Sequence, residues 1–303
     1  MKFLIATFDH NYYLWQCLVQ INNFMKYDYD IDTVYIVSTS NPSPVLKSLM
    51  NNNKIRSKFY LYEDTRVNVN YPVTLRHHIL EKFYRENPEY ESESIFLTDP
   101  DVIFTKKIDF SKLLADDCWY LSDTRSYISS QYIKQISSKL FKEMCDIVKV
   151  SYEEIEQIDE NAGGAQYLLK NITADFWNKC YIDSEKLYNH MNNTKNIYNK
   201  NGIIQSWTAD MWAILWNGVY FKHDIKIVDE LEFCWPFDDI SRWNKTNIFH
   251  NAGITGENDK YFSKTLYQNS PFNQNISIRE SNCSYQYYLE IKETEKNFKE
   301  ILF

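Results

Sequence analysis

Two aspartates one residue apart, Asp99 and Asp101, are the residues whose types and spacing best suit chemistry. They follow the largely apolar stretch 94–98 and precede a second apolar stretch at 102–104. The first stretch is typical of a buried strand in a parallel sheet, and α/β folds bind ligands at the carboxyl ends of such strands. Two carboxylates there favour Mg²⁺ or Mn²⁺, held jointly by protein and substrate phosphates. The pair therefore predicts a metal site and a substrate that carries a diphosphate.

The sequence has no glycine-rich phosphate loop. Six glycines occur in 303 residues, and none forms a G-x-G-x-x-G or P-loop pattern. A metal ion would therefore have to hold phosphates instead. Gly163 and Gly164 stand together in the segment 161–169, N-A-G-G-A-Q-Y-L-L. There a turn of small residues leads into an apolar strand and allows a ligand to approach the backbone closely.

His250 is a candidate for the third metal ligand. It lies in the segment 249–256, F-H-N-A-G-I-T-G, after a short apolar stretch. A lone histidine in such a place is often only a core or surface residue. A pair of aspartates that lacks a further ligand also favours a metal-binding role, because imidazole is a common metal ligand. Both interpretations of His250 stay open at this stage.

Strands and helices alternate along the first third of the chain. The apolar patterns predict strands at 3–8, 33–38 and 58–62 and helices at 12–25 and 73–84. The strand before Asp99 follows the second of these helices. This alternation predicts an α/β fold with a mostly parallel central sheet flanked by helices.

The rest of the chain predicts one clear strand and several helices. We expect a strand at 119–122, a helix at 131–148, a helix that opens with a capping box at 151–154, and a last packing helix at 285–303. No repeat, linker or low-complexity segment interrupts the sequence, so we expect a single domain over residues 1–303.

Composition and charge exclude several classes of function. The chain is 44% apolar and 24% charged, which is ordinary for a soluble globular protein. Its formal charge of -8, with no polybasic run, argues against a nucleic-acid partner. No apolar window suits a membrane span, and the N-terminal apolar stretch is too short for a signal peptide. The six scattered cysteines contain no C-x-x-C pair, which favours reduced thiols and a cytoplasmic location.

Aromatic residues make up an unusual 17% of the chain, with 24 tyrosines and 8 tryptophans. Five of the tryptophans fall within residues 207–243. Rings with an apolar face and a polar edge suit sugars and nucleobases. The cluster predicts either a tryptophan-rich core around one helix or a cleft that binds an acceptor. The abundance of tyrosine, asparagine and isoleucine also hints at an AT-rich genome, of a bacterium or a large DNA virus.

Four motifs occur in a suggestive order: D-P-D at 99–101, N-A-G-G at 161–164, W-T-A-D-M-W at 207–212 and H-N-A-G at 250–253. This order resembles that of metal-dependent glycosyltransferases of the GT-A fold. It is most similar to glycosyltransferase family 8 and to the peptidyl-serine galactosyltransferase and hydroxyproline arabinosyltransferase group, over residues 1 to about 265.

The resemblance implies transfer of a hexose or pentose from a nucleotide-sugar donor, with uridine diphosphate as the expected carrier, to a hydroxyl on a glycan or protein. It implies a Rossmann-like GT-A sheet; the helical stretch 131–160 is an insertion longer than that family's minimal core, and we expect a C-terminal helix after it. The nucleotide-binding half would cover residues 1–125, and the acceptor-side half, with the late histidine, would cover 126–303.

The resemblance also implies roles for single residues. Asp99, Asp101 and His250 match the Mn²⁺ (or Mg²⁺) ligands, and Asp99 also contacts the donor. Asn161, Gly163 and Gly164 match positions that line the sugar pocket, and Arg76 matches a contact to the diphosphate. Gly253, the glycine of the histidine motif, is a further donor-binding position. This chain departs from the family-8 pattern H-x-x-G-x-x-K-P-W, because Gly256 follows Gly253 and the nearest lysines are Lys260 and Lys264. Which of these two lysines, if either, contacts the diphosphate is therefore open.

The nucleoside is expected to meet residues that follow the first and third strands. Thr7, Asp9 and Tyr12 are placed to hydrogen-bond and stack on a base, and Asp64 is placed to contact the edge of the base. Asp9 with the histidine after it is equally typical of a turn, and Tyr12 of a buried helix face.

Asp210 is the candidate catalytic residue. A carboxylate acts as general base on the acceptor hydroxyl in an inverting enzyme, and it only orients the sugar in a retaining one. The alternative is that Asp210 flanks the apolar helix 211–216. Reserve candidates for the same role are Asp159, Glu160, Asp238 and Asp239.

Two other functions stay open. A haloacid-dehalogenase-like phosphohydrolase also uses an Asp-x-Asp at a strand end with Mg²⁺, but normally on the first strand, and here strand–helix units come first. A noncatalytic sugar-binding protein would keep the aromatic cleft and need no metal.

Overall fold

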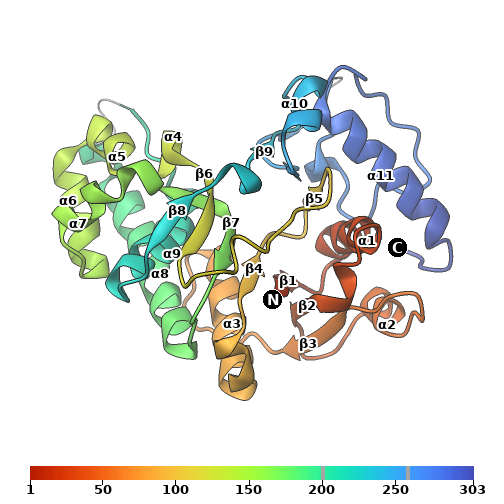
Figure 1. Cartoon of the computed structure of the whole chain (residues 1–303), viewed down its shortest axis with the longest axis horizontal. Coiled ribbons are helices and arrows are strands. Elements are labelled where there is room, and N and C mark those ends of the chain that lie inside the picture. The colour runs from red at the N-terminus through yellow and green to blue at the C-terminus, as the bar shows by residue number, and fades with distance from the viewer. Residues whose placement is uncertain (199–201, 257–259) are drawn as a thin grey trace. The chain divides into compact units, whose positions relative to one another are not determined.

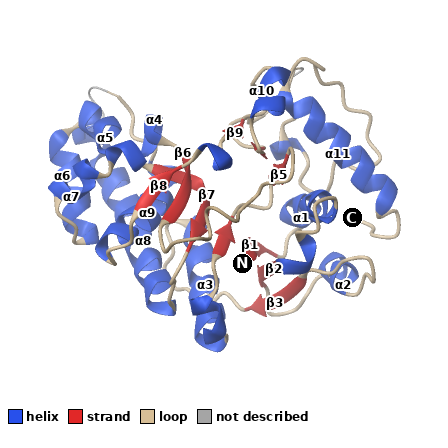
Figure 2. Cartoon of the chain, in the orientation of Figure 1, coloured by secondary structure: helices blue, strands red, loops and turns tan. Residues whose placement is uncertain are grey.

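The computed structural model describes residues 1–198, 202–256 and 260–303 and divides them into two compact units. Unit 1 comprises Met1, Tyr62–Leu97 and Phe110–Asp229. Unit 2 comprises Lys2–Leu61, Thr98–Asp109 and Glu230–Phe303. Both mix helices and strands (Figure 2).

Unit 2 begins with alternating strands and helices. These are β1 (Lys2–Phe8), α1 (Asn11–Met25), β2 (Thr33–Ser38), α2 (Pro44–Met50) and β3 (Lys58–Tyr62). The strand order is β3-β2-β1, and β1 pairs parallel with β2. The strands expected at 3–8, 33–38 and 58–62 and the first helix are confirmed.

A small second sheet completes unit 2. Its strands are β5 (Val102–Phe104), β9 (Phe233–Cys234) and β10 (Ile248–His250). The helices of this part of unit 2 are α10 (Ile240–Lys245) and α11 (Cys283–Asn297). The central strand β10 runs antiparallel to β5 and parallel to β9. Helix α11 packs on α1, as the ribbon shows (Figure 1). Trp15 and Val19 of α1 share a buried cluster with Tyr287 and Ile291 of α11, so the packing role expected for the last helix is confirmed.

Unit 1 contains α8 (Ala174–Tyr198), the longest helix among the described residues. Its elements are α3 (Leu75–Glu86), β4 (Ile95–Leu97), β6 (Trp119–Asp123), α4 (Arg125–Ile128), α5 (Ser130–Ile136), α6 (Ser138–Val148), α7 (Tyr152–Gln157), β7 (Gly163–Leu169), α8 (Ala174–Tyr198), α9 (Ala209–Tyr220) and β8 (Ile225–Ile227). The strand order is β4-β7-β6-β8. Strands β4, β6 and β8 run in one direction and β7 runs against them. The predicted α/β class, with mostly parallel strands and flanking helices, is confirmed.

Short 3-10 helices lie between the longer elements. They are η1 (Asp30–Asp32), η2 (Pro72–Thr74), η3 (Pro88–Ser92), η4 (Asp159–Asn161), η5 (Ser206–Thr208), η6 (Asp229–Leu231) and η7 (Lys264–Leu266). Among the described helices, none is both long enough and apolar enough to cross a membrane. The six cysteines are all buried and free of disulfides.

The single helix expected at 131–148 is wrong, because α5 and α6 are separate helices. Ser137 between them has extended backbone, with φ -164° and ψ 121°, and its hydroxyl accepts a hydrogen bond from the Leu140 N–H. A serine hydroxyl in this position caps the start of a new helix, because it accepts a hydrogen bond from a backbone N–H that has no carbonyl partner within the helix. The capping box of α7 is confirmed, because Ser151 and Glu154 each accept a hydrogen bond from the other's backbone N–H.

His77 of α3 is a fully buried histidine in unit 1. Its ring stacks on Trp177 of α8 with 6.0 Å between ring centroids, and its Nδ1 lies 3.3 Å from the Ser184 hydroxyl. Burial, with a smaller contribution from the neighbouring Arg76 charge, lowers the pKa of His77 from 6.5 to about 3. The folded chain therefore holds this imidazole neutral.

This histidine predicts a pH dependence of stability. Between pH 6.5 and about 3 the unfolded chain binds one proton more than the folded chain at His77, so stability falls as the pH falls. From pH 6.5 to 5 the loss from this group is about 2 kcal/mol. Urea unfolding at pH 7 and pH 5 should therefore show a larger loss for the wild type than for His77→Phe. Equal losses of stability in the two proteins would contradict the assignment of this pH dependence to His77.

Candidate functional site

Asp99 and Asp101 lie in the loop between β4 and β5. Two segments of unit 2 hold its backbone. The side-chain amide of Gln20 on α1 donates to the Asp99 and Val102 carbonyls at 2.8 and 2.9 Å, and the Thr98 N–H donates to the Leu4 carbonyl of β1 at 3.2 Å. The loop follows β4 rather than β1, whereas the phosphohydrolase alternative normally places the pair after the first strand.

Strand register brings His250 to the same loop. It ends β10, where it is paired with Val102 of β5, and the Asn251 N–H donates to the Asp101 carbonyl at 3.0 Å. The imidazole stacks on Trp235 with ring centroids 5.8 Å apart. Both contacts orient the ring, so the pairing of β10 with β5 places an imidazole beside carboxylates that lie far away in sequence.

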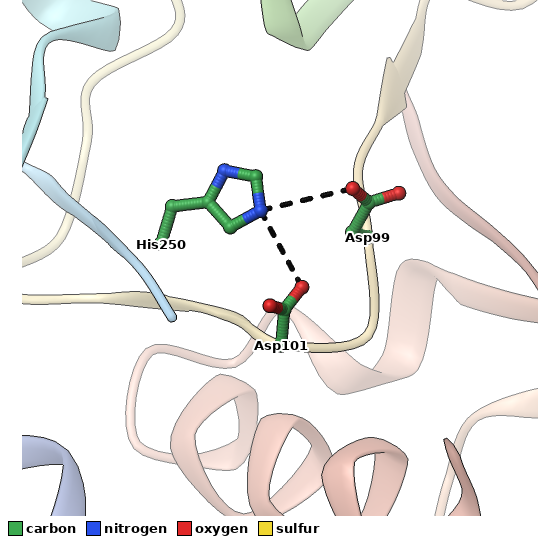
Figure 3. Close-up of side chains that lie close together, drawn as sticks. All are labelled: Asp99, Asp101 and His250. Atoms are coloured by element: carbon green, nitrogen blue, oxygen red, sulfur yellow. Dashed lines mark ion pairs between the residues drawn. The ribbon is translucent and has the colours of Figure 1, made fainter. Parts of the chain in front are cut away.

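The three side chains form one cluster (Figure 3). The Nε2 atom of His250 lies 3.5 Å from Asp101 Oδ1 and 3.7 Å from Asp99 Oδ2. One ligand atom from each residue lies within 4.8 Å of the others. Asp101 and His250 are buried, and the Asp99 side chain is 27% exposed. Two carboxylate oxygens and one imidazole nitrogen suit a divalent cation such as Mn²⁺, and the partial exposure of Asp99 leaves a side open to a substrate.

Lys264 of η7 joins the cluster through an ion pair between its Nζ and Asp101 Oδ2. Burial raises the pKa of Asp101, but the Lys264 charge, followed by His250, outweighs burial and leaves that pKa lowered. Burial lowers the pKa of Lys264, but the Asp101 carboxylate outweighs it and leaves that pKa raised. Both groups therefore carry charge at neutral pH. Of the two lysines left open by the sequence, Lys264 is the one whose ammonium pairs with Asp101.

Tyr12 lies close enough to this cluster for the cluster's charges to act on the pKa of its hydroxyl. Burial raises the pKa of the Tyr12 hydroxyl, and the Lys264 charge opposes that rise. The neighbouring candidate Thr7 is buried near the end of β1. Gly253 has a φ of +85°, a conformation that favours glycine, and a Cβ there would lie 3.4 Å from the Phe237 ring.

Asp9 has a structural role in unit 2. Its carboxylate accepts hydrogen bonds from the Ser43 N–H at 2.8 Å and from the Ser43 hydroxyl at 2.6 Å, and Ser43 caps α2. His10 caps α1 by accepting a hydrogen bond from the Tyr12 N–H. The turn interpretation of Asp9 and His10 thus describes their contacts, and a nucleoside contact of Asp9 stays a prediction.

Unit 1 holds a second charged group around Asp210. This buried carboxylate lies in the first turn of α9, where the helix dipole favours negative charge. It accepts a hydrogen bond from the Tyr71 hydroxyl at 2.9 Å, and its Oδ2 lies 3.5 Å from Arg76 Nη1. Arg76 is therefore paired rather than solvated. Burial raises the pKa of Tyr71 strongly, and Asp210 adds to that shift, so the hydroxyl stays protonated.

The other candidates of unit 1 also have structural partners. Asp64 accepts two hydrogen bonds from the Arg66 guanidinium at 2.9 Å, and the Asn161 side-chain carbonyl accepts from the Ile227 N–H at 3.2 Å. A Cβ on Gly163 would lie 2.5 Å from the Leu121 Cβ. Close strand packing therefore explains this glycine without a ligand.

Gly164 lies beside α9, since a Cβ on it would come 2.6 Å from the Met211 methyl group. The reserve carboxylates are occupied elsewhere. Asp159 accepts from Ser130, Glu160 pairs with Arg125, Asp238 accepts from the Trp235 N–H and Asp239 caps α10. Tyr71 is a residue that the sequence analysis missed, because its contact with Asp210 spans 139 positions and has no local signal.

Comparisons with known proteins give distant structural similarities only. No protein-family model matches the chain. No curated protein matches it either. Among solved structures, it is similar to the galactosyltransferase LgtC in complex with donor and acceptor sugar analogs, with 12% identity, a TM-score of 0.47 and full coverage of both chains. An active-site mutant of LgtC gives 12% identity and a TM-score of 0.47, over 97% of this chain and 96% of that one.

The apo structure of the bifunctional glycosyltransferase WbbM is similar at 9% identity with a TM-score of 0.48. The match covers 98% of this chain and 51% of WbbM. These similarities are low in both sequence and structure.

The cluster of Asp99, Asp101 and His250 predicts direct binding of Mn²⁺. Titration of the protein with Mn²⁺, followed by the electron paramagnetic resonance signal of the free ion, should show one site. His250→Gln should weaken that site by about tenfold or more, because it removes a ligand atom while leaving the Asp101 pair with Lys264 in place. The control Asp109→Asn changes an exposed carboxylate of unit 2 and should leave the affinity unchanged. An unchanged affinity in His250→Gln would contradict the assignment.

Proposed function

We propose that this chain is a metal-dependent glycosyltransferase that moves a sugar from a nucleotide-sugar donor, a UDP-sugar, to a hydroxyl on a glycan or protein. The observation that carries the proposal is the group of Asp99, Asp101 and His250, the last two of them buried, with the Lys264 ammonium paired to Asp101. Such a group suits a divalent cation together with the phosphates of a substrate. The order of the four sequence motifs supports the same class of enzyme.

The chemistry follows from where charge develops. Breaking the bond between an anomeric carbon and a nucleoside diphosphate puts negative charge on the leaving phosphate. A divalent cation, when bound by Asp99, Asp101 and His250, would stabilise that charge as a Lewis acid. Lys264 supplies a positive charge that is already in place before the reaction, so little reorganisation is needed when charge develops. Its ammonium donates to phosphate oxygens as readily as to a carboxylate.

Donor-binding residues are proposed in each of the two units. In unit 2, Tyr12, Thr7 and Asp9 would contact the nucleoside and Gly253 the donor. In unit 1, Asp64 is proposed to contact the edge of the base, and the donor contacts proposed from the motif resemblance are Arg76, Asn161, Gly163 and Gly164. The Lys264 and Asp101 charges both act on the pKa of the Tyr12 hydroxyl, which supports the place of Tyr12 among the proposed nucleoside contacts of unit 2.

Asp210 is the proposed catalytic carboxylate. The Arg76 guanidinium and the Tyr71 hydroxyl both interact favourably with its charged form. A carboxylate held charged and oriented in this way suits a general base toward a hydroxyl or a group that orients a sugar. The contacts of Asp210 support either role, and thus either stereochemical outcome.

The proposal predicts that UDP binding depends on the metal. Calorimetric titration with UDP should give micromolar affinity in the presence of Mn²⁺ and weak or no binding without it. Asp101→Ala should abolish the metal-dependent part, because it removes one metal ligand and the partner of Lys264. Thermal unfolding of the variant checks that it is folded. If UDP binds neither protein, with or without Mn²⁺, the UDP-sugar proposal is wrong.

A separate prediction concerns catalysis. Asp210→Asn should lower the rate of UDP release from a cognate UDP-sugar by about 100-fold or more, because the amide cannot accept a proton or carry charge. Its affinity for UDP with Mn²⁺ should stay that of the wild type. The donor is first chosen by measuring UDP release from UDP-glucose, UDP-galactose and UDP-N-acetylglucosamine with the wild type. A variant that keeps full activity would remove Asp210 from the catalytic machinery.

A further inference from the structure

The tryptophans of residues 207–243 do not share one environment. Trp212 and Trp216 of α9 are fully buried, so the core interpretation holds for them. Trp207 in η5 is 60% exposed and is the one exposed tryptophan among the residues that the structure describes. A large aromatic ring left open to solvent forgoes the stabilisation that burial would give it. An exposed ring of this size is therefore a candidate for a surface that a ligand covers.

The Trp207 ring is exposed but anchored. The Trp207 and Tyr71 rings meet in a T-shaped contact, with 5.7 Å between centroids and 84° between the planes. Tyr71 in turn stacks on Tyr188 of α8 with centroids 4.4 Å apart. The Tyr71 hydroxyl also hydrogen-bonds to the Trp207 carbonyl. A ring held from one side in this way presents its remaining surface without a large loss of side-chain entropy on binding.

The same tyrosine connects Trp207 to the proposed catalytic carboxylate. The Tyr71 hydroxyl lies 2.9 Å from Asp210 Oδ1, within hydrogen-bond distance of both Asp210 and the Trp207 backbone. Trp207 precedes Asp210 by three residues, directly before α9. An apolar aromatic surface and a charged hydrogen-bond acceptor are thus positioned by one buried side chain.

We propose that Trp207 is the stacking platform for a pyranose ring of the acceptor, so that the acceptor is a glycan; this rests on the proposed function. A pyranose has an apolar face of C–H groups and a rim of hydroxyls. Trp207 matches the apolar face, and Asp210 accepts a hydrogen bond from a hydroxyl on the rim. A peptide acceptor that carries no sugar has an apolar face of this size only at certain side chains. Such an acceptor does not require an exposed tryptophan together with a carboxylate.

Saturation-transfer NMR tests the platform with defined probes. The probes are the methyl β-pyranosides of glucose, galactose and N-acetylglucosamine, and lactose, each added to protein that holds Mn²⁺ and UDP. At least one probe should bind the wild type, Trp207→Ala should weaken it by about tenfold or more, and Trp207→Phe should recover most of the affinity because a flat ring remains. The control Tyr152→Ala removes another exposed aromatic of unit 1 and should change nothing.

The outcomes separate this inference from the proposed function. UDP affinity with Mn²⁺ is measured in each variant, and Trp207→Ala should retain it, which also shows that the variant is folded. Equal pyranoside binding by the wild type and Trp207→Ala would overturn the platform. So would UDP binding by the wild type with none of the sugar probes bound. Failure of UDP binding itself would instead count against the glycosyltransferase proposal.

Discussion

The candidate metal site depends on the burial of one carboxylate, Asp101. A buried charge is costly unless it is paired, and here the Lys264 ammonium and the His250 imidazole offset that cost. The pairing sets strict demands on the fold, because His250 has to end β10 in register with β5 and Lys264 has to reach the loop from η7. The small sheet of unit 2 and the α1 amide that holds the loop both serve to keep this carboxylate in place.

Unit 1 uses the same physical solution for a different carboxylate. Asp210 is also buried, and it is balanced by a guanidinium and a neutral hydroxyl instead of an ammonium and an imidazole. The difference matters for chemistry. An acid grouped with a second carboxylate and an imidazole suits metal binding, whereas an acid held by Arg76 and Tyr71 at a helix N-terminus suits proton transfer or sugar orientation.

Aromatic residues divide between structure and candidate function by their exposure. Trp15, Trp212 and Trp216 are fully buried and fill the interior. Trp235 stacks on His250 and orients a candidate metal ligand. Trp207 remains at the surface, tied to Tyr71. Sequence composition alone left the core and the cleft as equal interpretations, and the burial of each ring separates them.

Local sequence determined the strands of the first third, the capping box of α7 and the carboxylate pair at a strand end, because periodicity, capping and turn chemistry act over a few residues. Tertiary structure alone decided which distant groups meet. The contact between Lys264 and Asp101 spans 163 positions and that between Tyr71 and Asp210 spans 139. Such pairs arise from strand register and helix packing, which depend on the whole chain.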